Sequence, residues 1–184
     1  MAEASEASQP FILLPFPGES HPEGLSLRGD VSRLGEHLAI AFRLAGPLQA
    51  LQLPPLAPSP ERRDNLWQST CLECFLALPE SPGYWELNLS PSGHWNVYRL
   101  EGYRQALAAD PSFGRPGLER RPQPDRLELR LGCRLPPLLA AAPVLEMAIT
   151  AVIATTGGVL SYWALHHGGA EADFHRRDGF RLRV

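Results

Sequence analysis

The chain has 184 residues, of which 44% are hydrophobic and 20% are charged, and its formal net charge is -3. This length suits one domain, which would bury roughly two-thirds of the surface that the unfolded chain exposes. The composition is that of an ordinary globular protein. The negative net charge provides no field to hold a polyanion, so a general nucleic-acid binder is disfavoured.

Residues 1–10 are small and polar, and we expect a disordered tail there, followed by a single domain at residues 11–184. The N-terminus lacks a basic segment, and its apolar run FILLPF is short and broken by proline, so no signal peptide is expected. No stretch approaches the roughly 20 apolar residues of a membrane span. The expectation is therefore a cytoplasmic protein without a membrane partner.

Alternation of apolar and polar residues predicts the first strands. Leu38–Leu44 alternates with period two, and the four prolines within residues 51–60 then indicate a connecting loop or a sheet edge. Alternation returns in Thr70–Leu78, Tyr84–Ser90 and His94–Leu100. The sequence Ser-Pro-Ser-Gly between the last two is typical of a tight turn, so they should form an antiparallel hairpin.

The second half of the chain continues the β pattern. Residues 104–124 are a polar insert rich in proline and glycine, irregular or with one short helix near residues 105–109. Strands are predicted at Arg126–Cys133, Leu145–Ile153, Leu160–His166 and Phe180–Val184. With 19 prolines and 16 glycines, the chain is divided into short pieces. We expect an all-β fold, an antiparallel β-sandwich of two packed sheets, immunoglobulin-like or jelly-roll-like.

The segment 64–104 places an unusual set of side chains on the face that points away from the core. Amides, carboxylates and aromatic rings lie there on adjacent strands, namely Glu73, Phe75, Tyr84, Glu86, Asn88, Ser90, Asn96 and Tyr98. Flat rings and paired donors and acceptors suit a sugar, whose C–H faces stack on aromatics while its hydroxyls form hydrogen bonds. A buried polar network under the terminal segments would use the same residues, and both interpretations stay open.

Catalysis is not expected from these residues. Glu73 and Glu86 could form a carboxylate pair for glycoside hydrolysis, but nothing in the sequence marks either as perturbed. No G-x-S-x-G motif indicates a serine nucleophile. The sequence therefore predicts a protein that is not an enzyme.

Metal sites are not expected either. Cys71 and Cys74 form a C-x-x-C, but residues three apart on a strand point to opposite faces, which favours ordinary reduced thiols. A second candidate group surrounds Gly168 and Gly169, where a loop is a poor framework for a tetrahedral site. That group consists of His166, His167, Asp173 and His175.

Three stretches together resemble the DOMON-like superfamily. They are LWQSTCLECF at residues 66–75, YWELNLSPSGHWNVY at residues 84–98, and SYWALHH with ADFH near the C-terminus. The resemblance implies a β-sandwich that binds a haem or a sugar, as does the carbohydrate-binding module of some xylanases. In that module a Trp and a Glu six residues later help to hold the sugar, as Trp67 and Glu73 would here. Trp163 is the candidate for its second Trp.

We therefore expect a non-enzymatic domain whose open sheet face binds a small polar molecule, with a carbohydrate as the favoured ligand. The alternatives are a haem-binding domain that uses a His of the C-terminal loop, and a protein–protein interaction module without a small ligand. No other cofactor and no metal are expected. The candidate ligand-binding residues are Trp67, Glu73, Glu86, Asn88, Asn96, Tyr98, Trp163 and His175.

Overall fold

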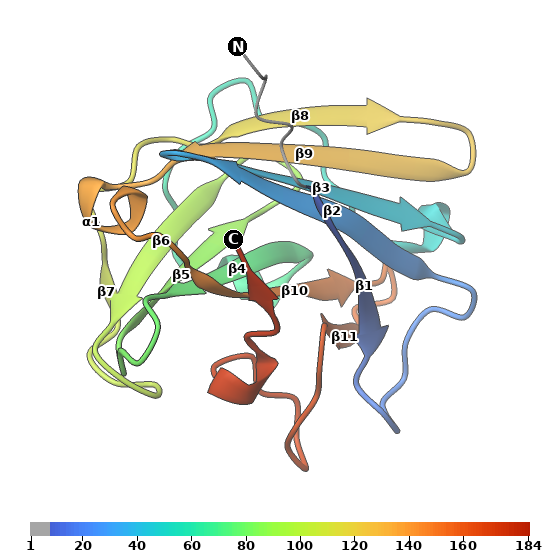
Figure 1. Cartoon of the computed structure of the whole chain (residues 1–184). Coiled ribbons are helices and arrows are strands. Elements are labelled where there is room, and N and C mark those ends of the chain that lie inside the picture. Colours follow the sequence, from blue (N-terminus) through green and yellow to red (C-terminus); the bar gives the residue numbers. More distant parts are fainter. Residues whose placement is uncertain (1–7) are drawn as a thin grey trace.

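A computed structural model describes residues 8–184. Twelve strands form one antiparallel sheet, which curls so that its two halves face each other (Figure 1). The first half contains β1 (Gln9–Pro15), β2 (Ser26–Leu34), β3 (His37–Ala45), β9 (Arg126–Arg134) and β8 (Gly117–Pro122).

The second half follows β1 on its other side. It contains β11 (Leu160–Ala164), β10 (Glu146–Ala154), β4 (Cys71–Ala77), β5 (Tyr84–Leu89), β6 (Trp95–Leu100) and β7 (Ala108–Ala109), and β12 (Leu182–Arg183) pairs with β10. β1 pairs with β2 through Gln9–Leu13 and with β11 through Leu14 and Pro15. The all-β antiparallel prediction is confirmed, but hydrogen bonding continues through β1 from one half to the other.

The residues that the period-two alternation predicts to be buried do lie in the core. The inward residues of β3 lie beside those of its neighbour β9 and pack with apolar residues of the second half in one interior cluster; on β3 they are Leu38, Ile40, Phe42 and Leu44. Trp85 and Trp95 pack in the same interior, as the sequence predicts. The hairpin of β5 and β6 closes through Ser90 and Gly93, whose φ of 88° needs a residue without Cβ.

Several elements differ from the expectation. Gln9 and Pro10 lie in β1, not in a tail, whereas residues 1–7 of the predicted tail lie outside the described residues. The helix predicted near residues 105–109 is wrong, because Ala106 has a φ of 54° and Ala108–Ala109 extend as β7. A short helix, α1 (Pro137–Ala140), occurs where none was predicted. Three 3-10 turns at Leu48–Ala50, Leu66–Gln68 and Arg177–Gly179 complete the elements.

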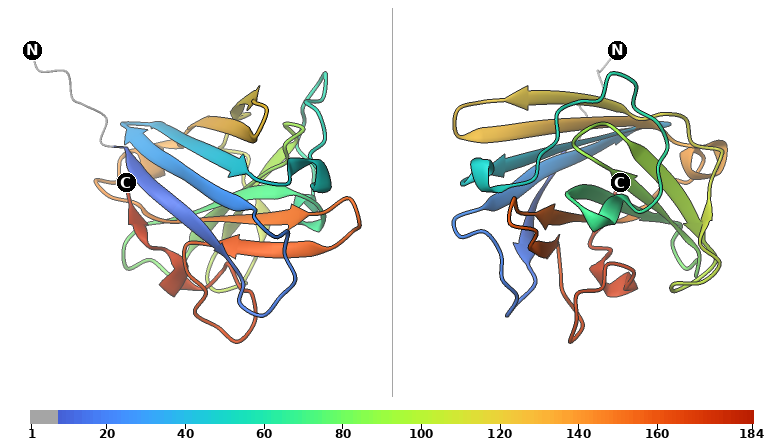
Figure 2. Two further views of the ribbon diagram at one scale, coloured as in Figure 1. Left: turned by 90° about the vertical axis from the view of Figure 1, so that its right-hand side faces the viewer. Right: turned by 180° about the vertical axis from the view of Figure 1, so that it is seen from behind.

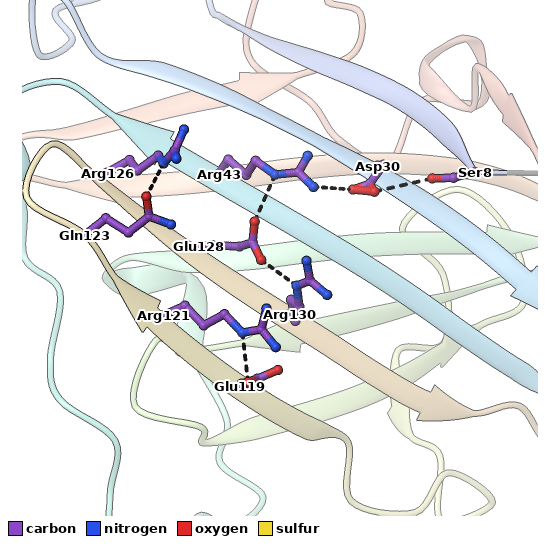
Figure 3. Close-up of polar contacts among 9 residues, drawn as sticks. All are labelled: Ser8, Asp30, Arg43, Glu119, Arg121, Gln123, Arg126, Glu128 and Arg130. Carbon is purple, nitrogen blue, oxygen red and sulfur yellow. Dashed lines mark hydrogen bonds and ion pairs between the residues drawn. The ribbon is translucent and has the colours of Figure 1, made fainter.

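The two halves of the sheet differ in what covers their outer faces. The outer face of β2, β3, β9 and β8 carries charged side chains (Figure 3). Arg43 donates to Asp30 at 2.8 Å and to Glu128 at 3.0 Å, and Arg130 donates to the same Glu128. Such partly exposed pairs at a sheet surface contribute little stability.

The outer face of β4, β5, β6 and β10 is covered instead. A second apolar cluster lies there, formed by Phe75, Ala77, Tyr84, Tyr98, Leu100, Ala148 and Phe180. The C-terminal segment that follows β11 runs beneath this half of the sheet (Figures 1 and 2). The expected open sheet face is therefore largely buried. Among residues 8–184, the helices are all too short or too polar to cross a bilayer.

We predict that Gly29 of β2 cannot be replaced without loss of stability. A Cβ at this position would lie 2.0 Å from the carbonyl oxygen of Ala41 and 2.2 Å from the ring of Phe11. Gly29→Ala should therefore lower the free energy of unfolding by about 1–3 kcal/mol, as measured by urea denaturation. Gly132→Ala on β9 is the matched control, because its Cβ meets nothing within 4 Å. Equal stability of the two variants would contradict this account of β2.

Candidate functional site

A cleft of about 410 Å³ lies between the covered outer face of the sheet and the segments that cross it. Residues from β4, β5, β10 and β11 form its floor, and the turn at Leu66–Gln68, the loop after β6 and the C-terminal segment form its walls. Its size is that of a small-molecule site. The lining residues are Trp67, Glu73, Phe75, Glu86, Arg104, Leu107, Val152, Tyr162, Ala172, Phe174 and His175.

Two carboxyl groups lie at the floor of the cleft. Strand pairing places Glu73 opposite Asn88 and Phe75 opposite Glu86, so both carboxyls project from the same face of β4 and β5. Glu73 is only 3% exposed and accepts a hydrogen bond from the Thr150 hydroxyl at 3.2 Å. Glu86 is 5% exposed and accepts one from the Asn88 amide at 2.9 Å through Oε1. Its Oε2 is buried without a partner.

His175 connects the C-terminal segment to the floor. Its Nδ1 lies 2.8 Å from the Tyr84 hydroxyl, which also accepts a hydrogen bond from the backbone N–H of Arg104 at 3.2 Å. In the neutral tautomer with its proton on Nε2, His175 accepts the proton of this hydroxyl at Nδ1. Nε2 lies 3.8 Å from Oε2 of Glu86, which is too far for a direct hydrogen bond.

The rim of the cleft is held by Asp173. Its carboxylate accepts hydrogen bonds from the Arg104 guanidinium at 2.9 Å, from the Tyr103 hydroxyl and from the backbone N–H of His175 at 3.1 Å. These hydrogen bonds and the charge of Arg104 outweigh partial burial and lower the pKa of Asp173. The rim is therefore an ion pair that fixes the C-terminal segment against the loop after β6.

Aromatic side chains supply the apolar walls. Phe174 packs edge-to-face against Tyr162, with ring centroids 6.0 Å apart, and both line the cleft. Trp67 lies on the other crossing segment and packs against Tyr98 at 5.9 Å. Phe75 completes the set from the floor. An arrangement of rings around buried acceptors can stack on the C–H face of a sugar while the acceptors take its hydroxyls.

Asn96 and Tyr98, two predicted ligand residues, are buried and belong to a partly buried network beside the cleft. Both donate to the Asp64 carboxylate, at 2.9 Å and 2.6 Å, and Asn96 also accepts a hydrogen bond from Arg62 at 3.0 Å. Neither lines the cleft. Because Asp64 lies two residues before the turn that carries Trp67, this network fixes that turn. Asn88 is likewise fully buried, and it acts on the cleft through Glu86.

Trp163 does not lie at the site. Strand pairing places it opposite Ala151 on the inner side of β11, and its ring packs in the interior with its indole N–H donating to Ser161 at 2.9 Å. Its neighbour Tyr162 points to the cleft. The period-two alternation of β11 is the signal that identifies Tyr162. For Arg104 and Phe174, which lie on irregular segments, no comparable signal exists.

The histidines near Gly168 and Gly169 do not converge on a metal site. His167 contacts the carbonyl oxygen of Leu14 at 2.9 Å, whereas His175 contacts Tyr84. Within residues 8–184, no group of three or more His, Cys, Asp or Glu side chains is arranged to hold a metal ion. Cys71 and Cys74 are free and buried, and Cys74 alone packs in the interior. Met147 also lies in the interior, so it cannot pair with His175 around a haem; haem binding itself stays a prediction.

The comparisons with known proteins show the fold. No family model matches the chain, and no curated protein matches its sequence, so the resemblance to the DOMON-like superfamily is not confirmed. A candidate carbohydrate-binding protein from Bacteroides uniformis is similar, with a TM-score of 0.65 at 10% identity over 95% of this chain and 84% of that chain.

A family 9 carbohydrate binding module from Caldicellulosiruptor kristjanssonii has a similar fold in two structures. Its complex with glucose has a TM-score of 0.50 at 12% identity, over 82% of this chain and 72% of that chain. Its complex with cellotriose has a TM-score of 0.51 at 11% identity, over 88% of this chain and 74% of that chain. At such low identities the likeness establishes a common fold.

Burial gives the site a characteristic dependence of stability on pH. It raises the pKa of Glu73 from 4.5 to about 8, with a further contribution from the charge of Glu86, and it lowers the pKa of His175 from 6.5 to about 4. A raised pKa means that the folded state binds more protons, so stability is lost as the pH rises towards 8. The lowered pKa of His175 acts in the opposite direction, because stability is lost as the pH falls through 6.5 towards 4.

We therefore predict that the free energy of unfolding decreases by about 1–2 kcal/mol between pH 6.5 and pH 8. Glu73→Gln should remove most of this decrease, because glutamine does not titrate. Glu119→Gln, at a site on β8 far from the cleft, should leave it unchanged. Urea denaturation at several pH values measures the free energy of unfolding. If this free energy changes with pH equally in wild type and Glu73→Gln, Glu73 is not the group responsible.

Proposed function

We propose that this chain is a non-catalytic carbohydrate-binding domain and that a sugar ring occupies the cleft between Trp67 and the C-terminal segment. The observation that carries the proposal is the composition of the cleft: aromatic rings surround a floor whose acceptor atoms include an unpartnered carboxylate oxygen of Glu86. Such an oxygen is costly to bury and gains a hydrogen bond when a hydroxyl group arrives. The fold shared with a module that binds glucose and cellotriose supports the same function.

The ligand would enter a cleft rather than lie on an open sheet. Trp67, Glu73, Glu86 and His175, four of the residues expected from the sequence, line the cleft. Phe174 takes the place that the sequence resemblance gave to Trp163. Asn88, Asn96 and Tyr98 support the walls and floor through the hydrogen bonds described above. These roles combine the two interpretations that the sequence left open, a binding face and a buried polar network.

We predict that Trp67→Ala lowers the affinity for a sugar by at least ~10-fold, because truncating an aromatic anchor typically costs more than about 1.4 kcal/mol. A glycan array identifies the sugar, and isothermal titration calorimetry then compares the affinities. Leu34→Ala, which replaces a side chain that is 52% exposed at the end of β2, is the control and should bind as wild type does. A wild-type protein that binds no glycan, or a Trp67→Ala variant with wild-type affinity, would contradict the proposal.

A further inference from the structure

We propose that the cleft selects a sugar with a free, protonated amino group, whose ammonium binds at Oε2 of Glu86 beside Glu73. This inference rests on the proposed function and names the substrate class of the same site. It follows from three features of the cleft. An acceptor at the floor has no partner, the nearby basic side chains are either paired with another carboxylate or uncharged, and the walls are aromatic.

The acceptor at the floor has no donor on the protein. Glu86 is 5% exposed, and the Asn88 amide holds its Oε1 at 2.9 Å, which leaves Oε2 free. An ammonium group offers three donors and no acceptor, whereas a hydroxyl brings one donor together with lone pairs that need donors of their own. The unpartnered Oε2 of Glu86 is therefore better complemented by an ammonium group than by a hydroxyl.

The cations that surround Glu86 compensate its charge only in part, because burial raises its pKa more than the charge of Arg104 lowers it. The Arg104 guanidinium is bound to Asp173 at 2.9 Å. His175 presents Nε2 at 3.8 Å, but burial lowers the pKa of its ring to about 4, so the ring is neutral at neutral pH. A buried carboxylate without a cationic partner is unfavourable, and a ligand ammonium would supply that partner.

The remaining groups around the floor do not oppose an ammonium. Tyr84 and Cys71 are neutral at pH 7, because burial raises the pKa of each above its ordinary value. Glu73 has a pKa of about 8 and therefore keeps its proton until a cation favours its carboxylate form. Trp67, Tyr162 and Phe174 offer aromatic faces, which attract a desolvated cation.

The test compares three sugars of one ring type by isothermal titration calorimetry: glucosamine, glucose and N-acetylglucosamine. At about pH 6.5 the amine of glucosamine is protonated, since amino groups of this kind lose their proton near pH 7.7–8.0. We expect glucosamine to bind at least ~10-fold more tightly than the other two sugars. Glu86→Gln, which keeps the shape of the side chain and removes its charge, should bring this ratio close to one. Glu119→Gln on β8 should keep the wild-type ratio.

The outcomes separate this inference from the proposed function. If the wild type binds glucose or N-acetylglucosamine as tightly as glucosamine, amine selection is wrong and the carbohydrate-binding function stands. If Glu86→Gln keeps the wild-type ratio, the ammonium does not bind at Glu86 and the inference is equally overturned. If none of the three sugars nor any glycan of the array binds, the proposed function itself fails. The comparison of sugars on the wild type needs no variant to fold.

Discussion

The strands β4 and β5 have no solvated side, because every residue from Cys71 to Ala77 and from Tyr84 to Leu89 is buried. One face packs in the interior of the curled sheet, and the other lies under the C-terminal segment and the turn that carries Trp67. Polar side chains on that second face must therefore find partners in a dry environment. The Asn88 side-chain N–H donates to Glu86, whereas Oδ1 of Asn88 and Oε2 of Glu86 find no partner, and Glu86 lines the cleft.

The cover over these strands depends on a small number of long-range contacts. The C-terminal segment is held by Asp173 against the loop after β6, by His175 against Tyr84 and by the packing of Phe180 among the rings of the second cluster. Backbone hydrogen bonds between Val184 and Leu145 then attach the end of the chain to the start of β10. The cleft is the space between this C-terminal segment and the outer face of the sheet. The contacts that hold the segment in place therefore stabilise the fold and also shape the site.

The sequence predicted most of the strands, since strict alternation in β3, β9 and the β5–β6 hairpin leaves one apolar face. It missed β2, because Gly29 occupies an inward position that Phe11 fills, and the apolar pattern is broken there. It also chose Trp163 over Tyr162, following a family resemblance where the alternation of β11 points the other way. The covered face could not be predicted, because the segment that covers it has no periodicity and its contacts are far apart in the sequence.

The central claim is that a sugar occupies the cleft beside Trp67, and the indole N–H signals of the four tryptophans test it most directly. In a ¹H–¹⁵N NMR titration with the sugar, the signal of Trp67 should shift, because its ring lines the cleft. The signals of Trp85 and Trp163 should stay in place, because their indole N–H groups donate inside the protein to Asp110 and Ser161. Trp95 is buried in the interior and should behave as they do. A sugar that binds without moving the Trp67 signal would contradict this account.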